Sequence, residues 1–263
     1  MKLLKMGRKT IQQCVIFTLI IMVLCGCQNG GELMEEKPII EQYLIDKYGK
    51  QFVVEKVDYY REQLGADKRI KAIAYPEDDK DLKFEVKKML DGKKWAFTDS
   101  EYSERYLNLL WDKQMKEKVI EEFGSDMVEV GVSAPILDIE KSIKGKTISI
   151  DEALEQNKQK ISMHISCGYL IDKESELDSS WLERIYSSIE AIRNDNFENI
   201  ALVIRFFNKD NEEDVKKNLG KYLKASASEY RDLKKGNVVL FNVEIGNMTD
   251  IKQPSDLQKY IDK

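Results

Sequence analysis

The chain contains 263 residues, with 42 basic side chains, 47 acidic ones and a formal net charge of −5. This length suits one large domain or two small ones. The acidic balance argues against a nucleic-acid-binding protein, because phosphate recognition requires clustered Lys and Arg. The single histidine also excludes zinc sites that need several histidines.

The N-terminus has the layout of an export signal. An apolar run from Cys14 to Cys25 follows four basic residues, namely Lys2, Lys5, Arg8 and Lys9. The run is about twelve residues long, whereas a membrane-spanning helix needs roughly twenty. We therefore expect residues 1–26 to be a signal peptide that is removed.

The signal ends in Leu24-Cys25-Gly26-Cys27, which resembles the lipobox of bacterial lipoproteins. In that family a diacylglyceryl group is attached to the final Cys, and a signal peptidase cuts just before it. The resemblance implies cleavage between Gly26 and Cys27, with Cys27 as the lipidated first residue. Cys25 departs from the pattern, since Ala, Ser or Thr is more usual there.

A lipid anchor of this kind determines where the body lies. Two acyl chains, such as palmitate, hold a protein firmly in the bilayer. We expect a location on the outer face of the cytoplasmic membrane, and the composition suggests a Gram-positive source. Removal of the signal takes four of the 42 basic residues and no acidic one, so the mature charge is about −9.

The mature chain begins with a short polar tether, residues 27–36. Its nine residues after Cys27 reach at most about 30 Å, so the body stays close to the bilayer. This geometry favours a membrane-proximal protein partner. Acylation of Cys27 leaves Cys167 as the only other mature cysteine, so no internal disulfide is expected.

The first module, residues 37–124, has the pattern of a helix, an antiparallel meander and a second helix. The first helix runs from Pro38 to Tyr48, with Gly49 as its C-cap. Strands are predicted at 52–60, 70–75 and 82–86. Asp91-Gly92 is a hairpin signal that leads to a strand with Trp95 and Phe97, and a long helix covers 100–123.

The second module, residues 125–263, alternates strands and helices. Strands are predicted at 161–171, 200–207 and 238–245, and helices at 149–159, 180–193, 212–233 and from Pro254. Ser149 and Glu152 form a capping box for the first of these helices. The strands recur about every 40 residues, which favours βαβαβ. The predicted fold class is α+β, a helix and meander module followed by an alternating β/α module.

His164 and Cys167 are the most reactive side chains of the body. Strand periodicity places His164 on one face with Ser162 and Ser166, and Cys167 on the other. A Cys167–His164 pair is therefore geometrically poor. Ser166 and His164 lie about 7 Å apart along the strand without an identifiable third group. We interpret them as a polar strand face with an inert thiol behind it, and we predict no catalytic residue.

No metal or cofactor site is predicted. The segment Asn208–Asp214 resembles the start of a calcium loop, but the Gly at position six and the Glu at position twelve are absent. We interpret it as a turn into a helix with an acidic first turn. The sequence contains no Gly-x-Ser-x-Gly, no Walker A motif and no Ser-x-x-Lys.

These observations favour a non-enzymatic lipoprotein that binds a protein or peptide near the membrane and needs no cofactor. Two alternatives stay open: a lipoprotein that binds a small ligand or the cell wall, and an envelope hydrolase with unrecognised carboxylates. A structural or immunity-type role is a further one. A pocket with convergent polar groups favours a ligand or a substrate, and a broad apolar patch favours a protein partner.

Overall fold

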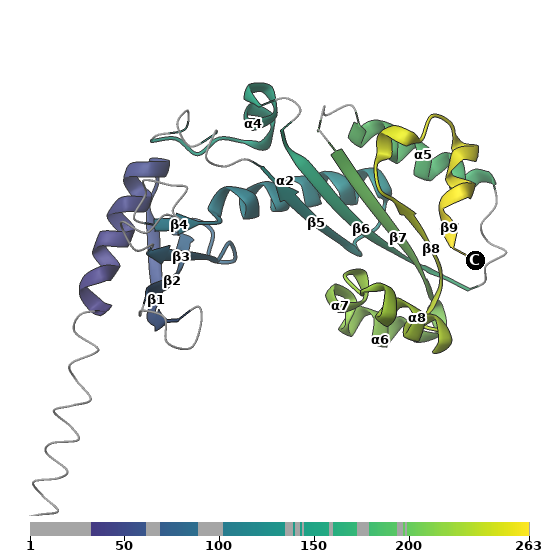
Figure 1. Ribbon diagram of the computed structural model, residues 1–263, viewed down its shortest axis with the longest axis horizontal. Helices are drawn as coiled ribbons and strands as arrows, with labels where there is room; N and C mark the ends of the chain where they lie inside the picture. Colours follow the sequence, from purple (N-terminus) through teal and green to yellow (C-terminus); the bar gives the residue numbers. More distant parts are fainter. Residues whose placement is uncertain are drawn as a thin grey trace, which may run out of the picture. The chain divides into compact units, whose positions relative to one another are not determined.

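The computed structural model of the chain describes residues 33–61, 69–88, 102–134, 139, 143, 145–157, 160–172, 179–193, 197 and 199–262. The chain divides into two compact units, Met1–Arg105 and Tyr106–Lys263. The first unit has a four-stranded sheet and the second a five-stranded one (Figure 1). The fold class is therefore α+β, as predicted. Gly26 and Cys27 lie outside the described residues.

The first unit packs one helix against an antiparallel meander. Its strands are β1 (Phe52–Tyr60), β2 (Arg69–Pro76), β3 (Phe84–Lys88) and β4 (Tyr102–Glu104), hydrogen-bonded in that order. The first three strands of this meander were predicted, and they are confirmed. The expected turn at Asp91-Gly92 and the strand around Trp95 and Phe97 lie outside the described residues.

The helix of the first unit covers residues 33–48 and buries Ile40, Leu44 and Tyr48. These residues are four positions apart, so they form one stripe along the helix. Gly49 follows with a φ of 69°, a left-handed conformation that ends helices and favours glycine. The predicted C-terminal end of this helix is confirmed.

The start of the same helix differs from the prediction. Residues 33–36 are helical, so the predicted start at Pro38 and the predicted tether through residue 36 are wrong. Pro38 lacks the N–H that would bond to the Met34 carbonyl. The turn before it is nevertheless held to the sheet, because Glu36 accepts hydrogen bonds from Lys88 (3.0 Å) and Tyr102 (3.2 Å).

Residues 102–104 form the edge strand β4 and not the first turn of the long helix, which is a second correction. Tyr102 pairs with Lys88 and Glu104 with Val86 of β3. The Glu104 carboxylate is buried and is contacted by Lys47 and by the Tyr48 hydroxyl, at 2.9 Å in the case of Tyr48. These non-local contacts favour the strand, which spacing along the sequence does not reveal.

The second unit is built on a mixed sheet, ordered β5-β6-β7-β8-β9. Its strands are β5 (Val128–Ser133), β6 (Ser162–Ile171), β7 (Asn199–Asn208), β8 (Val239–Ile245) and β9 (Ile261–Asp262). Its helices are α2 (Tyr106–Phe123), α4 (Ile150–Gln156), α5 (Ser179–Arg193), α6 (Glu212–Lys217), α7 (Leu219–Leu223) and α8 (Ala227–Lys235), with 3₁₀ turns η2 (Lys209–Asn211), η3 (Met248–Asp250) and η4 (Pro254–Tyr260). The predicted capping box of Ser149 and Glu152 opens α4.

The predicted βαβαβ order holds only for its first half. β6 and β7 are parallel and are joined through α5, but β7 and β8 are antiparallel. The predicted helix 212–233 is broken into α6, α7 and α8, and Ser226 and Glu229 form a capping box that starts α8. One unbroken helix would be about 33 Å long and would carry the chain along the sheet. The three shorter helices instead bring the chain back beside the end of β7, where the Asn208 N–H donates to the Val238 carbonyl.

The long helix α2 belongs to the second unit, although the sequence assigned it to the first module. Its buried residues follow a step of four, at Leu107, Trp111, Met115, Val119 and Phe123. The Trp111 indole donates to the Ile148 carbonyl at 3.2 Å, which ties the helix to the following segment. The boundary therefore lies between 105 and 106 instead of 124 and 125. Gly124 ends α2 with a φ of 61°, as predicted.

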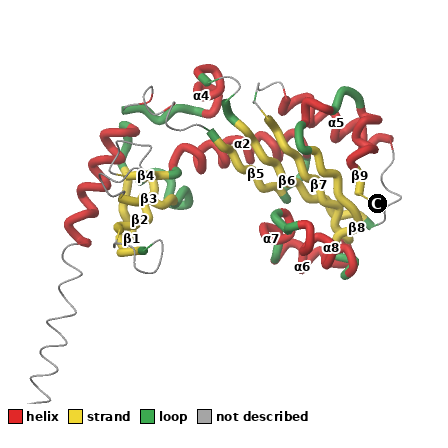
Figure 2. The backbone as a smooth tube through the Cα atoms, viewed as in Figure 1, coloured by secondary structure: helices red, strands yellow, loops and turns green. Residues whose placement is uncertain are grey.

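The sheet of the second unit has two different faces, and helices lie on both sides of it (Figure 2). One face is apolar, and α5 packs on it through Trp181, whose ring lies 5.5 Å from that of Phe206. On the other face α6, α7 and α8 cover a smaller cluster around Phe207 and Val239. The rest of that second face is polar, and the candidate site lies there.

Gly168 of β6 provides a test of this packing. A Cβ at this position would lie 2.9 Å from the ring of Phe207 and 3.2 Å from the Cβ of Met127. Phe207 is completely buried, so its ring has little room to move. We expect Gly168→Ala to lower the free energy of unfolding by about 1–3 kcal/mol in urea titrations.

The matched control for this substitution is Gly131→Ala in the neighbouring strand β5. A Cβ there meets no atom within 4 Å. The control should be neutral or stabilising by up to about 1 kcal/mol, because it restricts the unfolded chain. Equal stabilities of the two variants would contradict the close packing at Gly168.

Candidate functional site

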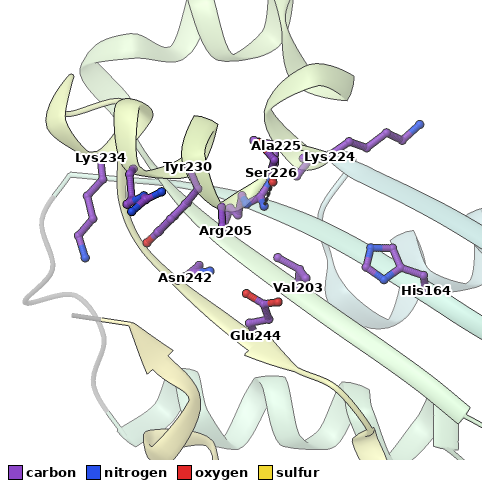
Figure 3. A pocket seen from close by; sticks show the side chains of 13 residues that line it. His164, Val203, Arg205, Lys224, Ala225, Ser226, Tyr230, Lys234, Asn242 and Glu244 are labelled. Atoms are coloured by element: carbon purple, nitrogen blue, oxygen red, sulfur yellow. Dashed lines mark hydrogen bonds between the residues drawn. The ribbon is translucent and has the colours of Figure 1, made fainter.

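A cavity of about 890 Å³ opens on the polar face of the second sheet (Figure 3). Strands β6, β7 and β8 form its floor, and α8 with the turn before it forms a wall. Six ionisable side chains line it, apart from tyrosine: His164, Arg205, Lys224, Arg231, Lys234 and Glu244. We refer to this cavity as the basic pocket.

Strand register explains why these side chains meet. Gly168, Arg205 and Asn242 are neighbours across β6, β7 and β8, and Val203 is the neighbour of Glu244. Side chains at alternate positions share one face, so Arg205, Asn242 and Glu244 all point to the same side. The site therefore requires that β8 runs antiparallel to β7.

Arg205 lies at the centre of the floor, with only 6% of its surface exposed. One Nη donates to the Tyr222 carbonyl, and the other donates to the Ala225 carbonyl at 2.9 Å. Its guanidinium carbon is 5.8 Å from the centre of the Tyr230 ring. Burial lowers the pKa of Arg205, but an arginine keeps its charge in proteins.

Two buried polar atoms in this floor have no hydrogen-bond partner within the described part of the chain. They are Nε of Arg205, a donor, and Oδ1 of Asn242, an acceptor. Asn242 is 4% exposed, so its side chain is shielded from bulk water. A buried polar atom without a partner costs about 1–3 kcal/mol, so a ligand group that paired with either atom would gain free energy from that contact.

The pocket carries an excess of positive charge in an acidic protein. Four cationic side chains face the single carboxylate of Glu244. Lys224 is 3.1 Å from Glu129, which neutralises part of its charge. Arg231 and Glu244 have no ion-pair partner among the residues that the structure describes. The local field therefore favours an anionic group.

The structure brings His164 and Ser166 together, with 3.2 Å between Nε2 and Oγ. The sequence placed them on one face, about 7 Å apart along the strand. Ser166 is 1% exposed and does not line the pocket, unlike Arg205 and Asn242, so its hydroxyl does not face a substrate there. Partial burial and the positive Arg205 lower the pKa of His164, and Glu244 opposes them. The charged form of His164 is thus disfavoured.

Cys167 lies on the opposite, apolar face, as predicted, and is completely buried. Burial raises its pKa to about 12. A thiol must lose its proton to act as a nucleophile, so Cys167 is chemically inert in the folded protein.

The acidic segment Asn208–Asp214 starts a helix, as predicted. Asn208 caps η2 by accepting a hydrogen bond from the Asp210 N–H at 3.0 Å, and Glu212 pairs with Lys216 at 2.6 Å. Among the described residues, no group of three or more His, Cys, Asp or Glu is placed to hold a metal ion. Within the same residues, no helix combines the length and apolarity that crossing a bilayer requires.

Sequence reasoning missed Arg205 and Asn242, the two residues at the centre of the site. Both lie in strands that were predicted, at 200–207 and 238–245, but in which no site residue was identified. A signal was present, because a charged residue inside the run Ile200–Phe207 has to be compensated by partners. The partners of Arg205 come from residues 17 and 20 positions later, which local patterns do not identify.

Comparisons with known proteins add little to this description. No protein-family model matches the chain, and no curated protein matches it. A similar solved structure is that of a DUF5037 family protein from Ruminococcus gnavus ATCC 29149, with 17% identity and a TM-score of 0.43. The likeness covers 85% of this chain and 98% of that chain. A likeness with this identity and TM-score says nothing about the chemistry of the pocket. We therefore infer that chemistry from the side chains that line the pocket.

The inertness of Cys167 is open to direct measurement. At pH 8 a thiol with a pKa of about 12 has almost no thiolate. We expect iodoacetamide to leave Cys167 unmodified in the folded protein and to alkylate it in urea, as detected by peptide mass mapping. Alkylation at the same rate in both conditions would contradict the buried position.

Proposed function

We propose that this chain is a lipid-anchored extracytoplasmic protein that binds a small ligand through an anionic group of that ligand, without catalysing a reaction. The observation that carries the proposal is the buried Arg205 in the floor of the basic pocket, with a donor that no described residue satisfies. Small-molecule sites are concave and carry a few convergent polar groups, and the pocket has these properties.

The pocket favours this function over the binding of a protein partner. Among the described residues, the large apolar side chains that are exposed are Met34 and Ile39, both on the helix 33–48. Two side chains do not make the broad apolar patch that a protein interface presents. Since Ser166 is buried and Cys167 is on the other face, the pocket also lacks an accessible nucleophile from the strand β6.

The anchor is the second part of the proposal. It is supported by the basic start, the short apolar run and the lipobox that ends at Cys27. Two acyl chains at Cys27 would hold the chain firmly in the bilayer. The described part of the chain begins six residues after Cys27, at residue 33. The anchor would then hold the first unit near the outer surface of the membrane and keep the pocket on the extracytoplasmic side.

The anchor has a mass-spectrometric test. We expect protein extracted from membranes to begin at a diacylated Cys27, because cleavage follows Gly26. The Cys27→Ala variant should keep its signal and lose the lipid. A wild-type chain that still begins with Met1, or an unmodified Cys27 in the membrane fraction, would contradict the anchor.

The pocket can be tested with inorganic phosphate as the probe and with His164 as a reporter. An anion beside the imidazole favours its protonated form, so phosphate should raise the pKa of His164 from its lowered value. Protons are then taken up on binding, and affinity should rise as the pH falls through that pKa. Because the chain has one histidine, its ring signal in NMR spectra is unambiguous.

Adjacent lysines on α8 provide a matched pair of variants. Lys234 lines the pocket, whereas Lys235 does not and is 79% exposed. We expect Lys234→Ala to weaken phosphate binding about fivefold in calorimetry, since a charge contact that solvent can reach contributes up to about 1 kcal/mol. Lys235→Ala has the same change of charge and should have no effect. Equal effects of the two, or no phosphate-induced change at His164, would contradict the site.

A further inference from the structure

The basic pocket is not uniformly basic, and its charges are separated in space. Arg205, Arg231 and Lys234 come from β7 and α8, whereas Asn242 and Glu244 stand two positions apart on β8. In Figure 3 the Glu244 carboxylate points from β8 toward the side on which Arg205 and Tyr230 lie. The pocket thus has a donor side and an acceptor side.

The Glu244 carboxylate favours the charged form of Arg205, but the two side chains do not form an ion pair. Arg205 is opposite Asn242, and Glu244 is opposite Val203, so Arg205 and Glu244 are diagonal neighbours. Diagonal Cα atoms in an antiparallel pair are about 7–8 Å apart. No ion pair joins Glu244 to any residue in the described ranges. A ligand that carries a negative and a positive group close together can contact both Arg205 and Glu244.

The two unsatisfied buried atoms require more from the ligand than an anion. Nε of Arg205 needs an acceptor, which a carboxylate provides. Oδ1 of Asn242 needs a donor, which an ionised carboxylate does not have. An ammonium group satisfies this oxygen, and it is also attracted by the Glu244 carboxylate nearby. A ligand with both groups leaves neither atom unpaired.

The balance of charge indicates the rest of the ligand. After one carboxylate is assigned to Arg205 and the ammonium to Glu244, Arg231 and Lys234 still face the cavity. A second carboxylate complements these two cations. The ring of Tyr230 and the side chain of Val203 provide apolar contact for a short aliphatic stem between them.

We propose that the pocket binds an α-amino acid with an acidic side chain. Its α-carboxylate lies against Arg205, its ammonium lies between Asn242 and Glu244, and its side-chain carboxylate lies toward Arg231 and Lys234. This inference rests on the proposed function, because it names the ligand class of the same pocket.

Three small molecules test the assignment on the full-length, detergent-extracted protein. L-glutamate has both carboxylates and the ammonium, glutarate lacks only the ammonium, and L-glutamine replaces the second carboxylate by an amide. We expect calorimetry to show that L-glutamate binds at least about tenfold more tightly than either of the others, which corresponds to about 1.4 kcal/mol. Each of the three should change the NMR signal of His164 when it binds.

The Glu244→Gln variant separates the ammonium contact from general anion binding. It should bring the affinity for L-glutamate to within about twofold of that for glutarate, and it should leave glutarate binding unchanged or tighter, since a repulsive charge is lost. Glu117→Gln, an exposed position on α2, is the control and should change neither affinity. Glu244 is exposed, so the substitution leaves the buried core intact.

The outcomes distinguish the two proposals. Glutarate that binds as tightly as L-glutamate, or a Glu244→Gln variant that keeps the preference for L-glutamate, overturns the amino-acid assignment and leaves anion binding in place. L-glutamine that equals L-glutamate overturns the second carboxylate site. If none of the three molecules and not even phosphate binds or changes the His164 signal, the proposed function itself is wrong.

Discussion

The second unit depends on the hydrogen bonds of one buried cation, Arg205. A charged group that loses its water has to regain polar partners, or it destabilises the fold by several kcal/mol. Arg205 finds two of these partners in the carbonyls of Tyr222 and Ala225, at the end of α7 and in the turn before α8. The same bonds hold the short helices over the Phe207 cluster, so the remaining polar face stays open as the basic pocket.

The site also follows from the unequal faces of the sheet. Its apolar face buries Cys167 and Phe206 under helices, and this packing keeps the strands in register. That register in turn places Arg205 opposite Asn242 on the polar face. In our proposal Arg205 is therefore both a structural residue and a ligand contact, because its Nη groups bind the backbone while its Nε remains without a described partner.

Local patterns predicted much of the secondary structure. Local composition identified β1, β6 and β7 closely, and Gly49, Gly124 and the Ser149 capping box marked helix ends. These signals involve residues within a few positions of each other, so sequence alone reveals them. The errors arose where contacts between residues far apart in the sequence determine the secondary structure. Tyr102 fits a helical stripe with Tyr106 by spacing, but pairing with β3 makes it a strand.

The candidate site likewise has features that the sequence predicts and features that depend on contacts between distant residues. The sequence by itself determined the α+β class, the acidic charge, and the placement of His164 and Cys167 on opposite faces, because composition and strand period two depend on nothing further. Only the tertiary structure decided that Arg205, Asn242 and Glu244 converge. Their meeting requires a break in the helices after β7, which turns β8 back antiparallel. That break competes with a continuous helical pattern, and contacts between residues far apart in the chain decide the outcome.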